Sequence, residues 1–131
     1  TPDELRHHFE LIRQQHLTPV SLEQLVTHLR TGLPLPPKPV LLSFDDGYAG
    51  HYQHVFPMLK EFGYPASFGI FTAKLDGTIV GRSTVTWEQV KEMAASPLVT
   101  ISSHSVTHPP DMRKMTPAQI TQEVTESKRL L

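Results

Sequence analysis

Hydrophobic residues recur at helical spacing in four parts of the chain, and each part is preceded by a sequence typical of a helix start. The four start sequences are Thr1-Pro2-Asp3-Glu4, Ser21-Leu22-Glu23-Gln24, Thr86-Trp87-Glu88-Gln89 and Thr116-Pro117-Ala118-Gln119. In each, the Ser or Thr side chain can accept a backbone hydrogen bond, and the Glu or Gln three residues later can return one. We therefore predict four amphipathic helices, the second with Leu29 on its apolar stripe and the last with Ile120 and Val124 facing inward.

Three short apolar runs lie between these helices and lack the alternation of a half-exposed strand. They occupy residues 40–44, 66–71 and 98–102, and a fifth helix with a weaker cap is predicted at about 57–63. Runs of this kind suit strands buried on both faces of a parallel sheet. Because helices alternate with the strands, the predicted fold class is α/β, with two helices before the first strand. The segment 74–85 is predicted to be a long surface loop.

Composition and charge exclude several classes of function. The 12 Lys and Arg residues are balanced by 13 Asp and Glu, so there is no basic excess to hold a nucleic acid. No apolar run approaches the roughly 18 residues of a transmembrane helix. The chain has no cysteine, so a metal ion would have to be held by Asp, Glu or some of the 8 histidines.

Polar side chains follow the first and third predicted strands. Asp45 and Asp46 come directly after the first strand, and His104 and His108 come after the third. Taken alone, Asp-Gly is a common turn and two histidines four residues apart are ordinary loop residues. However, the carboxyl ends of parallel strands meet at one edge of the sheet, where α/β proteins bind ligands. Two histidines and one carboxylate there would leave open positions on a divalent metal, with the second carboxylate beside it as a general base.

These two clusters resemble the motifs of a known family. Ser43-Phe44-Asp45-Asp46-Gly47 resembles the T/S-F-D-D-G motif of polysaccharide deacetylases of the NodB-like, carbohydrate esterase family 4 type. His104-Ser105-Val106-Thr107-His108 resembles their H-S/T-x-x-H motif. The likeness covers about residues 38–131, with residues 1–37 as an N-terminal helical lead-in. It implies a partial, distorted (β/α) barrel. Gly69 stands where the family often has an aromatic residue, and we expect no effect on the chemistry.

The resemblance also implies roles for individual residues. Asp45 would be the general base, while Asp46, His104 and His108 would hold a divalent metal, with zinc favoured and nickel, cobalt or iron compatible. Ser105 would brace the motif loop by a hydrogen bond. The implied substrate is an acetylated polysaccharide, from which acetyl groups, chiefly N-acetyl, are hydrolysed. The implied location is extracytoplasmic, although no signal peptide is visible in these residues.

Later motifs of the family have no counterpart in this sequence. They are an Arg-containing motif, an Asp–Trp region and a final Leu–His that supplies the general acid. Three strands cannot close a barrel, which takes roughly 200 residues or more. We therefore expect the chain to be the N-terminal portion of a larger deacetylase domain and to be poorly active alone. His51 and His54 are expected at the surface and not as replacement acids.

Two other classes of function share some of these features. Non-haem iron oxygenases also use two histidines and a carboxylate, although the alternation of strands and helices counts against them. A non-catalytic relative could use the same scaffold only to bind carbohydrate. Acetate release with and without metal separates an enzyme from a binding protein, whereas dependence on 2-oxoglutarate and oxygen would indicate the oxygenase.

Overall fold

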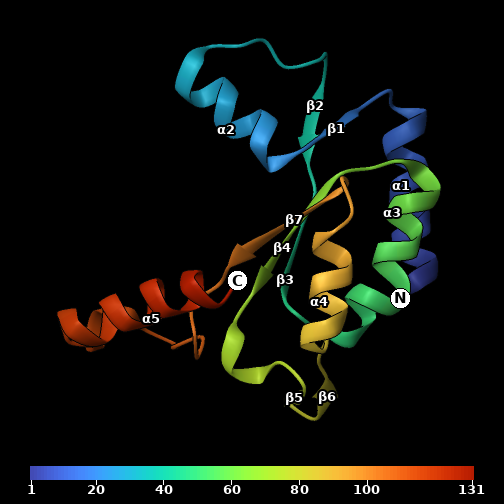
Figure 1. Cartoon of the computed structure of the whole chain (residues 1–131). Helices are drawn as coiled ribbons and strands as arrows, with labels where there is room; N and C mark the ends of the chain where they lie inside the picture. The colour runs from blue at the N-terminus through green and yellow to red at the C-terminus, as the bar shows by residue number, and fades with distance from the viewer.

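A three-stranded parallel sheet lies at the centre of the structure, a computed structural model that describes residues 1–131 (Figure 1). Its strands, in spatial order, are β3 (Ser43–Asp46), β4 (Ala66–Ile70) and β7 (Val99–Ser103). All five residues of the central strand β4 are buried, as its apolar run predicts. Ile70 pairs in register with Asp46 on one side and Ser103 on the other, so the three strands end at one edge of the sheet.

The structure contains five α-helices, and four of them begin where the sequence predicts. They are α1 (Pro2–Gln14), α2 (Leu22–Thr31), α3 (Phe56–Phe62), α4 (Trp87–Ala94) and α5 (Pro117–Leu130). The predicted caps are present in α1, α2, α4 and α5, since each cap side chain and the side chain three residues later exchange hydrogen bonds with the backbone. None of the helices is long and apolar enough to cross a membrane.

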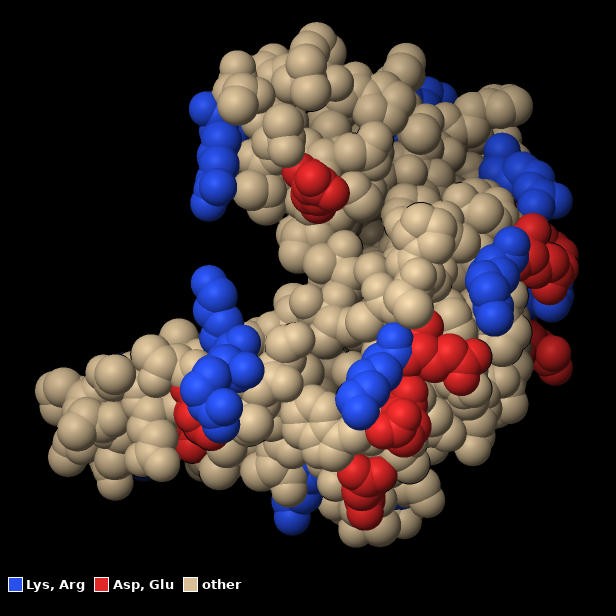
Figure 2. Space-filling view, in the orientation of Figure 1, with Lys and Arg blue, Asp and Glu red and all other residues tan.

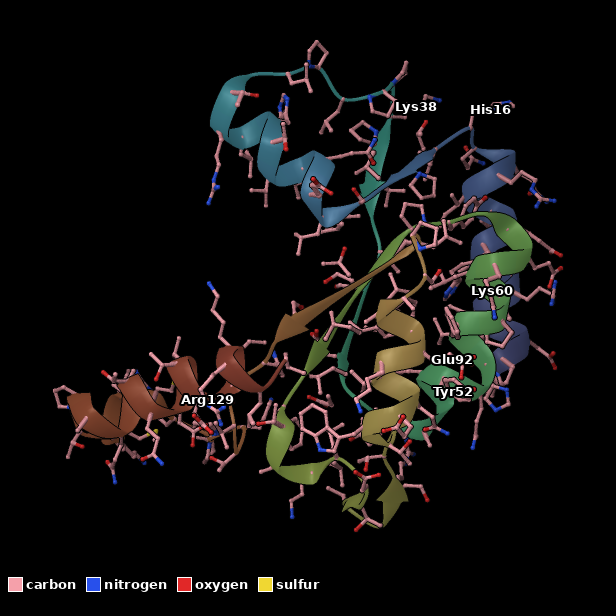
Figure 3. All side chains as sticks on the ribbon, viewed as in Figure 1. His16, Lys38, Tyr52, Lys60, Glu92 and Arg129 are labelled. Carbon is pink, nitrogen blue, oxygen red and sulfur yellow. The ribbon has the colours of Figure 1, made fainter.

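The hydrophobic core lies between the sheet and three of these helices. Figure 1 shows α1, α3 and α4 together on one side of the sheet. The buried side chains of these helices pack with those of β4. The largest fully buried side chains of this core are Phe9, Phe68, Leu59, Ile70 and Met93. At the surface, the Tyr52 hydroxyl donates a 2.6 Å hydrogen bond to Glu92 and so joins the turn before α3 to α4 (Figure 3).

The helix α5 lies apart from this core and is attached differently. Its buried residues are Glu123 and Ser127, whereas Val124 is 49% exposed. The prediction that Val124 faces inward is therefore wrong. The buried residues of this helix are polar, whereas Ile120 is partly buried.

The structure also contains short strands that the sequence pattern did not predict. β1 (Thr18–Val20) pairs in parallel with β2 (Pro39–Leu41), and the predicted strand 40–44 is divided between β2 and β3. The predicted loop 74–85 holds a hairpin of β5 (Thr78–Ile79) and β6 (Arg82–Ser83). Strands of two or three residues are too short to show a hydrophobic period, which explains why the pattern missed them.

The helix α2 stands off from the core. None of its residues is buried, and Leu29 is 73% exposed, so the stripe predicted for this helix does not enter the core. Figure 2 shows the surface hollowed between the part of the chain that carries α2 and the part that carries α5. Acidic and basic side chains are interspersed over the face in this view.

The different surroundings of two leucines predict different effects of the same substitution. Leu59 is fully buried in the core, so Leu59→Ala should lower the free energy of unfolding by about 2–5 kcal/mol. Leu29→Ala is the matched control and should change it by less than about 0.5 kcal/mol. Urea denaturation of both variants measures this. A cost for Leu29→Ala equal to that of Leu59→Ala would contradict the burial described here.

Candidate metal centre

The two polar clusters meet at the carboxyl edge of the parallel sheet. Asp46 is the last residue of β3, and His104 directly follows the last residue of β7. The backbone N–H of His104 donates to the carbonyl of Ile70, which continues the pairing of β7 with β4 by one residue. His108 returns to the same place through a five-residue loop, 104–108, here called the histidine loop.

One carboxylate oxygen of Asp46 lies between the two imidazoles. Asp46 Oδ1 is 3.6 Å from His104 Nε2 and 3.6 Å from His108 Nε2, and one ligand atom from each residue lies within 4.8 Å of the other two. A separation of 3.6 Å is too long for a hydrogen bond. It is close to the distance of about 3.4 Å between neighbouring ligands of a tetrahedral ion bound at about 2.1 Å. The spacing of the three side chains therefore suits ligands of one divalent metal ion better than it suits direct hydrogen bonds between them.

The backbone at this cluster adopts an unusual conformation. Asp46, Ser105 and His108 all have positive φ angles, of 79°, 69° and 56°. For residues other than glycine such angles cost about 1–3 kcal/mol each and persist only where the surroundings hold them. Within the histidine loop, Ser105 Oγ accepts a 3.0 Å hydrogen bond from the backbone N–H of His108. The other hydrogen bonds that hold this loop are made with other parts of the chain.

Asp45 lies beside the cluster and is not part of it. Its carboxylate is exposed and lies over Gly69, the residue opposite it in β4. A Cβ atom added at Gly69 would stand 2.7 Å from Asp45 Oδ1 and 3.6 Å from His104 Cβ. Gly69 thus leaves the space that the Asp45 side chain occupies, a contact that the family resemblance did not lead us to expect.

His51 is not the surface residue that the sequence suggested. It begins a π-helical turn, His51–Val55, and its ring packs against Phe44 and Phe68 at centroid distances of 5.8 and 5.7 Å. Its Nδ1 atom is buried without a hydrogen-bond partner. Burial lowers the pKa of His51, and the nearby carboxylates of Asp46 and Asp45 oppose this only in part, so the neutral ring is favoured. His54 is exposed, as expected.

The histidine loop also contacts a carboxylate that the sequence did not single out. Glu123 in α5 is only 7% exposed and accepts hydrogen bonds from the backbone N–H groups of Val106 and Thr107, both at 2.8 Å. It also accepts one from the Thr107 hydroxyl at 2.6 Å. Burial acts to raise the pKa of Glu123, but these hydrogen bonds outweigh it and hold the pKa below its usual value. Since its partners lie 16 and 17 residues upstream, no local pattern marks this residue.

A cavity of about 400 Å³ opens beside the two histidines. Its polar side is formed by the histidine loop, and its apolar side includes Met112 and Val124. A ligand with a polar group and a small apolar group could place the first near the histidines and the second against this wall.

Comparison with known proteins places this α/β scaffold in a family. A family model described as polysaccharide deacetylase matches residues 32–131. The poly-β-1,6-N-acetyl-D-glucosamine N-deacetylase of Escherichia coli (strain K12) is 38% identical over 112 residues, which are 77% of this chain and 17% of that protein. The chain therefore belongs to the polysaccharide deacetylase family, as its motifs suggested.

Solved structures agree with this assignment. The BpsB deacetylase domain from Bordetella bronchiseptica superposes with a TM-score of 0.80 and 33% identity, over 96% of this chain and 62% of that one. The Streptococcus pyogenes deacetylase PplD, solved in complex with acetate, gives a TM-score of 0.85 at 25% identity, over 99% of this chain and 56% of that one. The predicted fold class, a partial barrel of the NodB type, is confirmed. The chain spans less than two thirds of each of these relatives.

Two glycines with positive φ allow a test of whether the turn directly after Asp46 fixes the position of that residue. Gly47 has φ 88° directly after Asp46, and an added Cβ would stand 3.2 Å from Ile70 Cδ1; Gly32 has φ 75° and open space around it. Gly32→Ala should cost about 1 kcal/mol of stability and leave zinc affinity unchanged. Gly47→Ala should cost more, and it should also weaken zinc binding because the strand end carrying Asp46 must shift.

Urea denaturation and calorimetric titration with zinc measure both effects. Equal zinc affinity in the two variants would show that Asp46 does not depend on this turn.

Proposed function

We propose that this chain provides the metal ligands and the general base of an extracytoplasmic polysaccharide deacetylase that removes N-acetyl groups from an amino-sugar polymer. The observation that carries the proposal is the placement of Asp46 Oδ1 at 3.6 Å from both His104 Nε2 and His108 Nε2. The activity named for the E. coli relative supports an N-acetylglucosamine polymer as the substrate. The acetate complex of the S. pyogenes relative supports acetate as the product.

Asp46, His104 and His108 would hold the ion, which we propose is zinc, with nickel, cobalt and iron compatible with the same ligands. When bound, such an ion polarises the acetyl carbonyl and makes water more acidic. Neutral imidazoles and an ionised carboxylate are the protonation states that this role requires.

Asp45 is proposed to take the proton of the attacking water. Its carboxylate is exposed, it lies next to the ligand Asp46 along the chain, and Gly69 leaves it room above the sheet. After attack, the amide C–N bond breaks, acetate leaves, and the amine of the sugar must gain a proton. Asp45, which then holds the proton taken from water, is the one assigned side chain that can return it to the nitrogen, and the lack of a separate acid costs about 10²–10⁴ in rate. We therefore expect slow acetate release by these 131 residues alone.

The cavity beside the histidines supports the same reaction. Its apolar wall of Met112 and Val124 suits the methyl of an acetyl group, while the carbonyl would face His104 and His108. The parallel sheet and the family membership favour this reaction over that of an iron oxygenase.

Removal of one proposed ligand should abolish tight metal binding. His104→Ala should weaken zinc affinity by more than about 100-fold, because removing a ligand costs more than disturbing the groups that orient it. His54→Ala is the matched control, since His54 is exposed and outside the cluster. The zinc affinity of this variant should equal that of the wild type. Isothermal titration with zinc measures both, and equal affinities in the two variants would contradict the assigned ligands.

Asp45→Asn should separate catalysis from metal binding. Zinc affinity should stay within about threefold of wild type, while acetate release from N-acetylglucosamine oligomers should fall by about 10²-fold or more. A single-turnover assay with excess protein detects the slow reaction. Loss of zinc binding equal to that in His104→Ala would show that Asp45 is a ligand. Oligomer binding with no zinc-dependent acetate release by the wild type would instead indicate a carbohydrate-binding protein.

A further inference from the structure

The histidine loop needs external support because its own backbone is strained. Ser105 and His108 both have positive φ, and only one hydrogen bond, from the His108 N–H to Ser105 Oγ, closes the loop internally. Its carbonyl groups are held from one side, where the N–H groups of Thr72 and Ala73 donate to Ser105 and Val106 at 3.3 and 2.9 Å. The N–H groups of Val106 and Thr107, in the middle of the loop, donate to an acceptor on the other side.

Glu123 supplies that acceptor. Oε2 receives the N–H groups of Val106 and Thr107, and Oε1 receives the Thr107 hydroxyl, at 2.6–2.8 Å. Hydrogen bonds to an ionised acceptor are about twice as strong as neutral ones. No lysine, arginine or histidine forms an ion pair with this buried carboxylate, so its hydrogen bonds all go to the loop between the two histidines.

The attachment of α5 is consistent with a role beyond packing. A surface helix ordinarily buries an apolar stripe. In α5 the buried residues are Glu123 and Ser127, and Ser127 Oγ lies 2.6 Å from the hydroxyl of Ser103 at the end of β7. Both polar contacts are made to the segment that carries His104 and His108.

We propose that Glu123 is a positioning residue of the metal centre, which holds the histidine loop in the strained conformation that presents His104 and His108 to Asp46. This inference rests on the proposed metal-binding function and extends it to a residue in α5. Without Glu123, two N–H groups lose their acceptor and the loop can relax toward ordinary φ angles. The ligands would all be present, but they would no longer be held together before the ion arrives.

The test compares zinc affinity in Glu123→Ala, Glu123→Gln and a control on the same helix, Glu126→Gln. Glu126 is ion-paired with Arg129 at the surface of α5 and does not contact the loop (Figure 3 labels Arg129). Glu123→Ala should lose about 10–100-fold in affinity, the range typical for groups that orient metal ligands. Glu123→Gln should recover most of it, because the amide oxygen can still accept from both N–H groups. Glu126→Gln should match the wild type.

Titrations are made well below the unfolding temperature of each variant, so that every variant is folded. The visible absorption spectrum of bound Co²⁺ reports the geometry of the metal ligands independently of stability. Thr107→Val, which removes only the hydroxyl hydrogen bond, should weaken binding about two- to tenfold and keeps the test decisive if Glu123→Ala does not fold. A wild type that binds no zinc would refute the proposed function itself. A wild type that binds zinc with affinity and Co²⁺ spectrum equal to those of the Glu123 and Thr107 variants would refute only the role of Glu123.

Discussion

The parallel register of β3, β4 and β7 is the constraint on which the whole site depends. Asp46, Ile70 and Ser103 lie level with one another, so the residues that leave the two outer strands meet at one edge. Side chains alternate between the faces of a strand, and a slip by one residue would exchange the places of Asp45 and Asp46. The buried residues of β4, with Phe68 at their centre, fix the register and thereby decide which carboxylate faces the histidines.

Stability and function are separated in space within this fold. The core formed by Phe9, Leu59, Phe68 and Met93 lies on the side of α1, α3 and α4. The residues with positive φ at the sheet edge, such as Ser105 and His108, are held by polar contacts. There α5 contributes the carboxylate of Glu123 and the hydroxyl of Ser127. Such a division lets the site keep unfavourable backbone angles, since the core offsets their cost.

Local signals explain what could be predicted from the sequence. The capping residues Thr1, Ser21, Thr86 and Thr116 act within one helical turn, and the continuous apolar run 66–71 is itself a signal of a buried strand. These elements therefore lie where expected. The proximity of Asp46 to His104 and His108 could be predicted because the ends of neighbouring parallel strands share one edge of the sheet. Its residue roles remain predictions. The contacts of Glu123, the partial burial of His51 at the start of a π-helical turn and the exposure of Leu29 depend on tertiary packing, which no hydrophobic period encodes.

The binding of one divalent ion by Asp46, His104 and His108 is the central claim, and anomalous diffraction at the zinc absorption edge tests it most directly. We predict a single strong peak about 2.0–2.2 Å from a carboxylate oxygen of Asp46 and from Nε2 of both histidines. The same crystal would show whether Asp45 stays outside the coordination shell. A zinc-soaked crystal whose anomalous peaks all lie away from these three side chains would contradict the claim.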